Sequence, residues 1–445
     1  MAGEEEQTEK YPMQMVPLLM REENKESNDD YDPKVVSLGP YHHGKEKLKF
    51  VEDFKPTAVR MFIDTLDENV FMAAILEDIG YTRSCYPEEF KSKYSDEEFA
   101  RMMLRDACVI LNYIGPSRNE ESHKRAETIG HLGTAVYISI RRDMYLLENQ
   151  VPFRILEILV RLKYGTNRHA FIKDMEKFSF KMFFHDEEEK IEEVNETNKL
   201  GTKALHLLEI FRRVIVTGHE TTTGDNPCCD INNLVATLCC EDADNAPTGG
   251  RYVFRSVTDL KSKGIHFRAS QIKSLKGVRF SPSQFCHSAK LKLPLLYVGM
   301  ETRVFFKNVI AYEFSPYVAN NDKAVTAYVS FMKLLVVTKQ DVKELREEKI
   351  IINRLGSDKE VVQVYKDLNT YGAEDDSYFW DVKKEIEEHY NSKAKTWMAE
   401  LNSTYFNNPW SIIALIGSLF LLCLDIVQTY YTVNGGDPCG SKRPS

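Results

Sequence analysis

Several chemical signatures are missing from this chain of 445 residues. None of its nine cysteines forms a C-x-x-C pair. The adjacent doublets Cys228-Cys229 and Cys239-Cys240 lack the spacing of about two to four residues that zinc ligands usually show. This scattered, odd set fits a reducing compartment at least as well as a disulfide framework. The G-x-S-x-G motif of serine hydrolases is also absent.

The chain has no excess of positive charge and no apolar N-terminal segment. Its 58 Lys and Arg residues face 67 Asp and Glu residues, giving a net charge of −9, so no nucleic-acid partner is predicted. The opening residues MAGEEEQTEK are too polar for a secretory signal peptide. We interpret residues 1–30 as an acidic, disordered N-terminus.

The composition that remains is that of a globular, mostly helical protein. Hydrophobic residues make up 43% and charged residues 28% of the chain, enough for one large core or two ordinary ones. Apolar residues recur at helical spacing in PTAVRMFIDTLDENVFMAAILEDIG and in SDEEFARMMLRDACVILNYI. Ser95 with Glu98, and Ser357 with Glu360, form capping boxes that mark helix starts.

The second half of the chain adds β-structure. The stretches GVRFSPS, AKLKLPLLYV and ETRVFFKNVIAYE contain alternating and β-favouring residues. Leu291, Leu293 and Leu295 fall on one face of such a strand. The predicted fold class is therefore a mainly α-helical (α+β) body with a small antiparallel β-sheet in its second half. This globular domain should span residues 31–408, with a possible seam between sub-domains near 186–227.

An apolar run lies near the C-terminus. From Trp410 to Val427 it would form a helix about 27 Å long, near the roughly 30 Å of a bilayer core. Its eleven large apolar side chains contribute about −5 kcal/mol, against a cost of about 3 kcal/mol or less for Asp425. The sequence thus predicts a single transmembrane helix at 409–429, inserted in the lipid bilayer, and a short polar tail at 430–445. A buried core helix is the alternative.

The position of this run bears on localisation. A span so close to the C-terminus, without a signal peptide, predicts a tail-anchored protein with a cytosolic body. Its membrane would be the plasma membrane or the endoplasmic reticulum. If the body faced outward instead, the sequons at Asn195 and Asn402 could carry glycans.

The stretch GPYHHGK, from Gly39 to Lys45, has the G-x-x-x-x-G-K spacing of a phosphate-binding loop. The motif needs Ser or Thr next, to place a hydroxyl on Mg²⁺, but Glu46 stands there. Neighbouring side chains in extended chain point apart, so one metal ion rarely binds both His42 and His43. We therefore predict no nucleotide, metal or other cofactor.

Five residues could in principle carry catalysis: His42, His43, Asp106, Cys108 and Glu148. The cysteine lies in an apolar helix, where an inert core thiol is expected. The two carboxylates lie in apolar segments, where structural hydrogen bonding is more common than acid–base work. No catalytic residue is predicted. An enzyme of unrecognised type would need these groups in one His/carboxylate cleft.

The stretch LLENQVP sits in an apolar helical pattern that Pro152 must interrupt and that closes near Gly165. Pro152 leaves the carbonyl of Glu148 without its helical partner. We predict that side chains among Glu148, Asn149 and Gln150 are buried and hydrogen-bonded to backbone.

Several stretches together resemble one family. They are VSLGPYHHG, MLRDACVILN, DMYLLENQVPFRILEIL, GVRF with LKLPLLYVGMETRVFFKNVIAYE, IIINRLGSDKEVVQVYKDL and YFNNPWSIIALIGSLFLLCLDIVQTYY. In this order they are similar to a plant family of single-pass membrane proteins catalogued as domain of unknown function 247. The likeness covers about residues 35–431. Ala107, Val109 and Asn112 stand where the family pattern has Gly, Phe and Glu, and Arg154 replaces an apolar residue.

The resemblance implies a helical body, a C-terminal membrane anchor and no established enzymatic activity. Some relatives are implicated in self-recognition during grass pollination, others in stress or defence. We therefore expect a membrane-anchored, non-enzymatic recognition or scaffold protein with an unidentified protein partner. Its contacts are predicted in the acidic and Thr-rich loops 186–197 and 217–227. An enzyme using the His/carboxylate cleft is the alternative.

Overall fold

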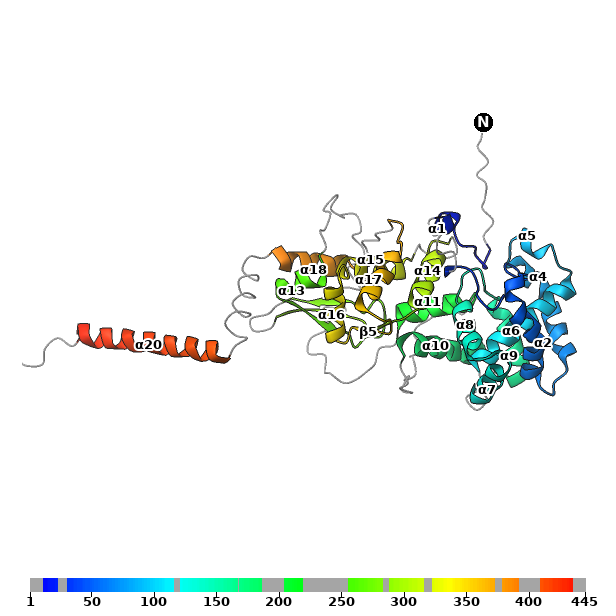
Figure 1. Cartoon of the computed structure of the whole chain (residues 1–445), viewed down its shortest axis with the longest axis horizontal. Coiled ribbons are helices and arrows are strands. Elements are labelled where there is room, and N and C mark those ends of the chain that lie inside the picture. Colours follow the sequence, from blue (N-terminus) through cyan, green and yellow to red (C-terminus); the bar gives the residue numbers. More distant parts are fainter. Residues whose placement is uncertain are drawn as a thin grey trace, which may run out of the picture.

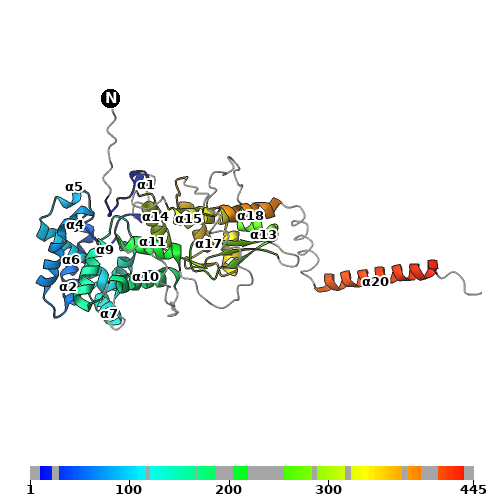
Figure 2. The same ribbon diagram turned by 180° about the vertical axis from the view of Figure 1, so that it is seen from behind.

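A computed structural model describes most of the chain, and Figures 1 and 2 show it from opposite sides. The described residues are 11–22, 30–115, 121–166, 168–185, 204–218, 255–282, 288–315, 322–372, 378–391 and 409–434. The sequons at Asn195 and Asn402 and most of the loops 186–197 and 217–227 lie outside these ranges.

Helices alone build the first half of the body. The longest described one there, α6 (Asp96–Ile114), begins at the predicted capping box of Ser95 and Glu98 and ends at Gly115, whose φ is 61°. It packs against four neighbouring helices, α2, α3, α7 and α9, because apolar side chains cover most of its surface. The helical elements of this half are α1 (Leu18–Glu22), η2 (Glu46–Leu48), α2 (Lys49–Ile63), α3 (Glu68–Glu77), α4 (Ile79–Ser84), α5 (Glu88–Lys91), α6, α7 (Glu121–Leu132), α8 (Thr134–Asp143), α9 (Phe153–Tyr164), α10 (Arg168–Phe184) and α11 (Leu207–Thr217).

Two small sheets and further helices build the second half. Strand β3 pairs in parallel with β1 and antiparallel with β2, while β4 and β5 form a separate parallel pair. The elements are α13 (Val257–Ser262), β1 (Ile265–Ala269), β2 (Arg279–Ser281), β3 (Ala289–Leu293), β4 (Leu296–Val298), α14 (Thr302–Glu313), α15 (Ala324–Leu335), α16 (Lys339–Glu347), β5 (Ile351–Asn353), α17 (Asp358–Asp367) and α18 (Trp380–Asn391).

These sheets correct the predicted antiparallel sheet. The body is mainly helical with small sheets, but one sheet is mixed and the other parallel. Strands β1 and β3 pair in parallel with β2 between them in sequence, and β4 pairs with β5 across helices α14 to α16. The stretch ETRVFFKNVIAYE is also not a strand. It forms α14, which is buried on every side except at Arg303. Because α14 buries polar as well as apolar residues, its sequence does not show a clear apolar face, and its β-favouring residues were misleading.

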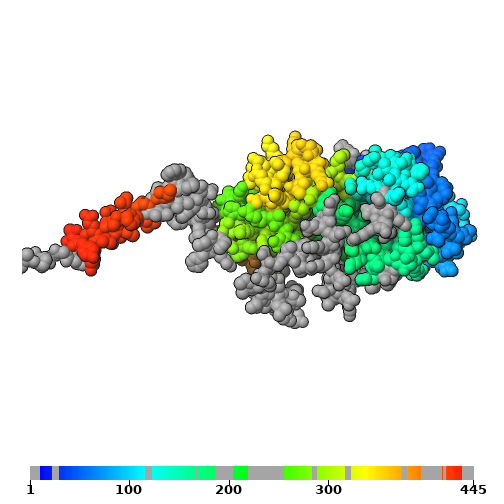
Figure 3. All heavy atoms as spheres, turned by 90° about the horizontal axis from the view of Figure 1, so that it is seen from below, coloured from blue at the N-terminus to red at the C-terminus, as the bar shows by residue number. Residues whose placement is uncertain are grey.

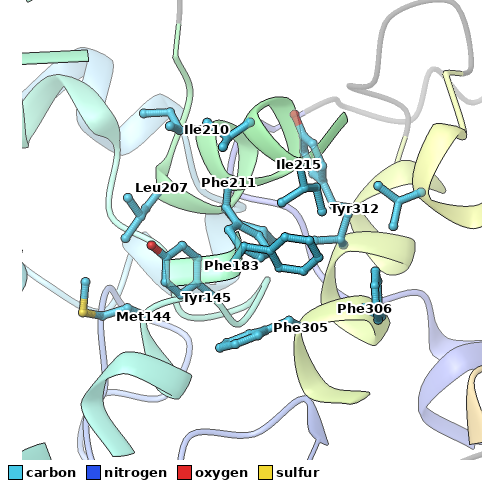
Figure 4. Packing of buried hydrophobic residues seen from close by; sticks show 14 of the residues in the cluster. Met144, Tyr145, Phe183, Leu207, Ile210, Phe211, Ile215, Phe305, Phe306 and Tyr312 are labelled. Atoms are coloured by element: carbon cyan, nitrogen blue, oxygen red, sulfur yellow. The ribbon is translucent and has the colours of Figure 1, made fainter. Parts of the chain in front are cut away.

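One core joins the two halves. Figure 4 shows Tyr145, Phe211 and Phe305 packed together where the end of α8, α11 and α14 meet. The ring centroids of Tyr145 and Phe211 lie 4.9 Å apart, and those of Phe211 and Phe305 lie 5.7 Å apart. The same hydrophobic cluster runs through both halves, which adjoin in the space-filling view of Figure 3. The described part of the predicted seam, residues 204–218, therefore lies within shared core rather than between separate cores.

The prediction of a disordered segment at 1–30 is wrong for residues 11–22. Met13, Val16 and Met20 are buried in the core cluster. The amide of Met13 donates to the carbonyl of Cys85 at 3.0 Å. Asp30 is buried too, 2.8 Å from the ammonium of Lys307. The apolar stretch MQMVPLLM is short and lies among many charged residues, so the sequence did not indicate that it packs into the core. Residues 1–10 and 23–29 lie outside the described chain.

The apolar run near the C-terminus forms one continuous helix, α20 (Pro409–Asn434), drawn apart from the body in Figures 1 and 2. Among the helices that the structure describes, none is both long and apolar enough to cross a membrane. The predicted transmembrane helix at 409–429 is therefore wrong. The helix continues through Asp425, Gln428 and Asn434, so polar groups enter it where the prediction weighed mainly the apolar run. The bilayer contact, the tail-anchored topology and the membrane localisation rested on that span and fall with it.

Candidate functional site

The GPYHHG stretch enters the fold as extended chain whose main chain is bound by buried side chains. The amide of Leu38 donates to Asn149 Oδ1 at 2.7 Å, and the amide of Gly39 donates to Asp106 Oδ2 at 2.7 Å. Just before them, the amides of residues 34–36 all donate to the carboxylate of Asp143. A phosphate loop would offer its amides to the ligand. Here a protein side chain occupies the first of them, that of Gly39, and the amide of Lys45 donates to the carbonyl of His42.

Asp106 belongs to a buried ion pair. Its Oδ1 lies 2.6 Å from Lys55 Nζ, and both side chains are essentially unexposed. Lys55 also donates to the carbonyl of Ser37 at 2.8 Å and lies 2.6 Å from a carboxylate oxygen of Glu52. Burial raises the pKa of Asp106 above its usual value, and the Lys55 ammonium opposes that rise. The pair therefore fastens Ser37 and Gly39 to helices α2 and α6.

We call the buried polar side chains that bind the main chain of residues 34–39 the frame. The ENQ residues of LLENQVP form its other side, and the prediction that they are buried and bound to backbone is confirmed. Asn149 Nδ2 donates to the carbonyls of Val36 and Asp143. Gln150 Nε2 donates to two carbonyls of the preceding loop, and its Oε1 accepts from the amide of Leu208. Residues 144–152 are therefore a loop between α8 and α9 rather than part of one interrupted helix.

Glu148 fastens the N-terminal segment. Its Oε1 accepts from the amide of Val16 at 2.8 Å, and its carboxylate forms an ion pair with Arg21. Arg21 in turn pairs with Asp32 at 3.2 Å. The carboxylate thus holds α1 and the residues before it against the body.

Four of the five candidate catalytic residues divide between two networks: His42 lies with Glu148, and His43 is linked to Asp106 through Glu52 and Lys55. His42 is 3% exposed and lies 3.9 Å from Glu148, and its Nδ1 is 2.7 Å from Lys45 Nζ. Burial and then Lys45 lower the pKa of His42 to about 3, which keeps the ring neutral. His43 instead faces Glu52, with 3.5 Å between Nδ1 and Oε1.

The other two candidates are also engaged or inert. Asp106 is bound to Lys55 and Gly39. Cys108 is fully buried, and burial raises the pKa of its thiol. Asp106 and Glu148 thus both lie beside GPYHHG, Asp106 at Gly39 and Glu148 at His42, but they share no partner. In the described chain no group of three His, Cys, Asp or Glu side chains is placed to hold a metal ion.

A cavity of about 410 Å³ lies elsewhere, between α2, α7 and α9, and sequence reasoning missed it. Its polar lining includes Arg60, Asp64, His123, Lys124, Glu127 and Lys163. None of the five candidate catalytic residues takes part. The sequence places Arg60 and Asp64 four residues apart at the end of α2, but this spacing does not reveal the helices that face them.

These observations define a mainly helical α+β protein in which two distinctive sequence stretches bind each other through buried hydrogen bonds. A family model described as "Plant protein of unknown function" matches residues 13–424. The chain belongs to this family, domain of unknown function 247, which confirms the family resemblance but not its description as single-pass membrane proteins.

Two relatives of Arabidopsis thaliana are similar along most of their length. A UPF0481 protein is 29% identical over 414 residues, covering 90% of this chain and 82% of its own. A putative UPF0481 protein is 21% identical over 476 residues, covering 91% of this chain and 87% of its own. No solved structure gives a significant match.

Proposed function

We propose that this plant protein is a non-enzymatic recognition or scaffold protein that binds another protein. The observation that carries the proposal is how the buried polar side chains around GPYHHG are used. Asp106 and the ENQ side chains bind main chain, including that of Gly39 and of the N-terminal segment, rather than converging on a space where a substrate could sit. An enzyme using a His/carboxylate cleft has less support, because His42 lies beside Glu148, whereas His43 and Asp106 are joined only through Glu52 and Lys55.

The frame also suggests where a partner binds. Glu148 fixes the main chain at Val16, and on the same segment Leu18 and Leu19 are 71% and 59% exposed. Large apolar side chains held outward on a rigid support are typical of protein contacts. The loops 186–197 and 217–227 remain a second predicted contact region.

The test compares labelled neighbours of two full-length variants in plant cells. Leu18→Ser/Leu19→Ser removes the exposed pair, while Phe50→Ser removes an exposed apolar side chain of α2 that is 60% exposed. Proximity labelling should yield proteins that the Phe50 variant retains and the double variant loses. Purified candidates should then bind the wild-type chain at least about tenfold more tightly than the double variant, as expected for loss of anchor residues.

Identical labelled sets and equal affinities for both variants would reject α1 as the contact. Repeating the comparison with Gly-Ser replacements of 186–197 and 217–227 tests the loops in the same way. If neither change alters any partner, the recognition proposal is wrong.

A further inference from the structure

The cavity between α2, α7 and α9 is a second candidate site, independent of the proposed protein contact. Arg60 and Asp64 line it from the last turn of α2 and the residue that follows. His123 and Lys124 come from the first turn of α7, and Lys163 from the end of α9. Its volume of about 410 Å³ falls in the range of small-molecule sites, roughly 300 to 1,000 Å³.

Two ammonium groups are positioned over the same pair of aromatic rings. Lys124 Nζ lies 5.2 Å from the ring centroid of Phe62 and donates to the hydroxyl of Tyr164 at 3.0 Å. Lys163 Nζ lies 4.8 Å from the Phe62 centroid and 5.1 Å from that of Tyr164. Phe62 is fully buried and packs edge-on against Tyr164, so both cations stand on a fixed platform.

The third cation stands at the rim. The exposed Arg60 donates to the hydroxyl of Thr57, which also lines the cavity, at 2.8 Å. Its planar guanidinium can bind two anion oxygens at once, whereas an ammonium acts as a point charge. Three cations face two carboxylates, Asp64 and Glu127, so the cavity is net positive in a chain whose net charge is −9.

Each of the three cations also has a contact within the protein. Lys163 donates to the carbonyl of Phe62 near the end of α2, where cations commonly stabilise a helix. Lys124 and Arg60 donate to the hydroxyls of Tyr164 and Thr57. These contacts hold the three cations around one hollow, where a single anion can reach all of them.

We propose that this cavity binds a phosphate monoester of a small polyhydroxy compound. A phosphate dianion suits the two ammonium groups and the guanidinium, each of which forms charge-assisted hydrogen bonds. The carboxylates of Asp64 and Glu127 and the hydroxyl of Thr57 accept hydrogen bonds from the hydroxyl groups of the ligand. Phosphate alone would leave these acceptors unused.

Calorimetric titration of the full chain with glucose 6-phosphate, at constant ionic strength, tests the proposal. We expect saturable binding at one site, with no detectable binding of glucose. Lys163→Gln and Arg60→Gln should each weaken binding at least tenfold. The charge-matched control Lys339→Gln, on the exposed start of α16, should leave binding unchanged. Arg60 is exposed, so its variant keeps the test valid if Lys163→Gln does not fold.

A lipid headgroup could present the same phosphate chemistry. The second experiment is therefore co-sedimentation of the protein with phosphatidylcholine vesicles that contain or lack phosphatidylinositol phosphate. Retention that requires the phosphorylated lipid and is lost in Arg60→Gln would support a headgroup as the source. Soluble binding without vesicle retention would support a free metabolite. If neither probe binds, or if Arg60→Gln and Lys339→Gln behave alike, the proposal is overturned.

Discussion

The ion pair between Lys55 and Asp106 offers the sharpest test of the buried frame. Asp106→Asn keeps the shape of the side chain and an acceptor for the amide of Gly39, but it removes the charge opposite Lys55. Lys55→Met removes the opposite charge. Because both side chains are fully buried, each single variant leaves its partner charged in a site from which water is excluded.

Breaking a buried pair from one side typically costs about 3–5 kcal/mol. We expect the low end, about 3 kcal/mol, because Glu52 lies 2.6 Å from Lys55 and retains part of its stabilisation. An unfolding entropy of about 2.1 cal/mol/K per residue converts 3 kcal/mol into a fall in melting temperature of about 3 to 4 °C. Urea titration followed by circular dichroism gives the free energy of unfolding directly.

The double variant Lys55→Met/Asp106→Asn decides the mechanism. It removes both buried charges, and only the part-exposed Glu52 loses its contact with Lys55. The double variant should therefore be less destabilised than the sum of the single variants by about 2 kcal/mol. The exposed pair of Arg268 and Glu348 serves as control, with a coupling below about 1 kcal/mol. Additive losses at Lys55 and Asp106, or single losses below about 1 kcal/mol, would refute the buried-pair argument.

Three further predictions concern the same frame. Gly39 and Gly44 both have positive φ, but a Cβ at Gly39 would lie 2.9 Å from the carbonyl oxygen of Gln150, whereas one at Gly44 meets nothing within 4 Å. In urea titrations Gly39→Ala should therefore lower the free energy of unfolding by at least about 3 kcal/mol and Gly44→Ala by about 1 kcal/mol. Equal losses would contradict the close approach at Gly39. His42 has a pKa of about 3 in the folded protein, below its unfolded value, so only the unfolded chain gains this proton as the pH falls below about 6.5. Between pH 7 and pH 5 the free energy of unfolding should therefore fall by about 2 kcal/mol more in the wild type than in His42→Gln. Parallel pH profiles would show that the ring is not held neutral. Glu148→Gln should cost about 1–3 kcal/mol and speed hydrogen exchange at the amide of Val16, and a fully stable variant that loses only partner binding would favour a binding site at Glu148.

Local patterns in the sequence predicted local structure well. The capping box of Ser95 and Glu98 starts α6, and Gly165 closes α9 in the left-handed conformation. Such signals work because neighbouring residues decide them. Pairing between strands is different, since β3 pairs with both β1 and β2, and the direction of each pair depends on the path of the chain between the strands. The alternation of Leu291 and Leu293 could therefore predict a strand but not that β1 would run parallel to it.

The buried ENQ side chains were predictable for the same reason, because Pro152 necessarily frees carbonyls that something must satisfy. What they bind was not predictable, since Val36 and Leu208 are brought to them only by the tertiary fold.

The cavity between α2, α7 and α9 lay further beyond reach. Lys124 and Lys163 appear in the sequence as ordinary charges on helices, and they are 39 positions apart. Only the packing of both helices around Phe62 gives them a shared environment. A catalytic motif is visible in sequence because one turn or loop supplies several of its groups. A pocket that takes its side chains from three helices leaves no such trace, so the lack of a motif is no argument against binding.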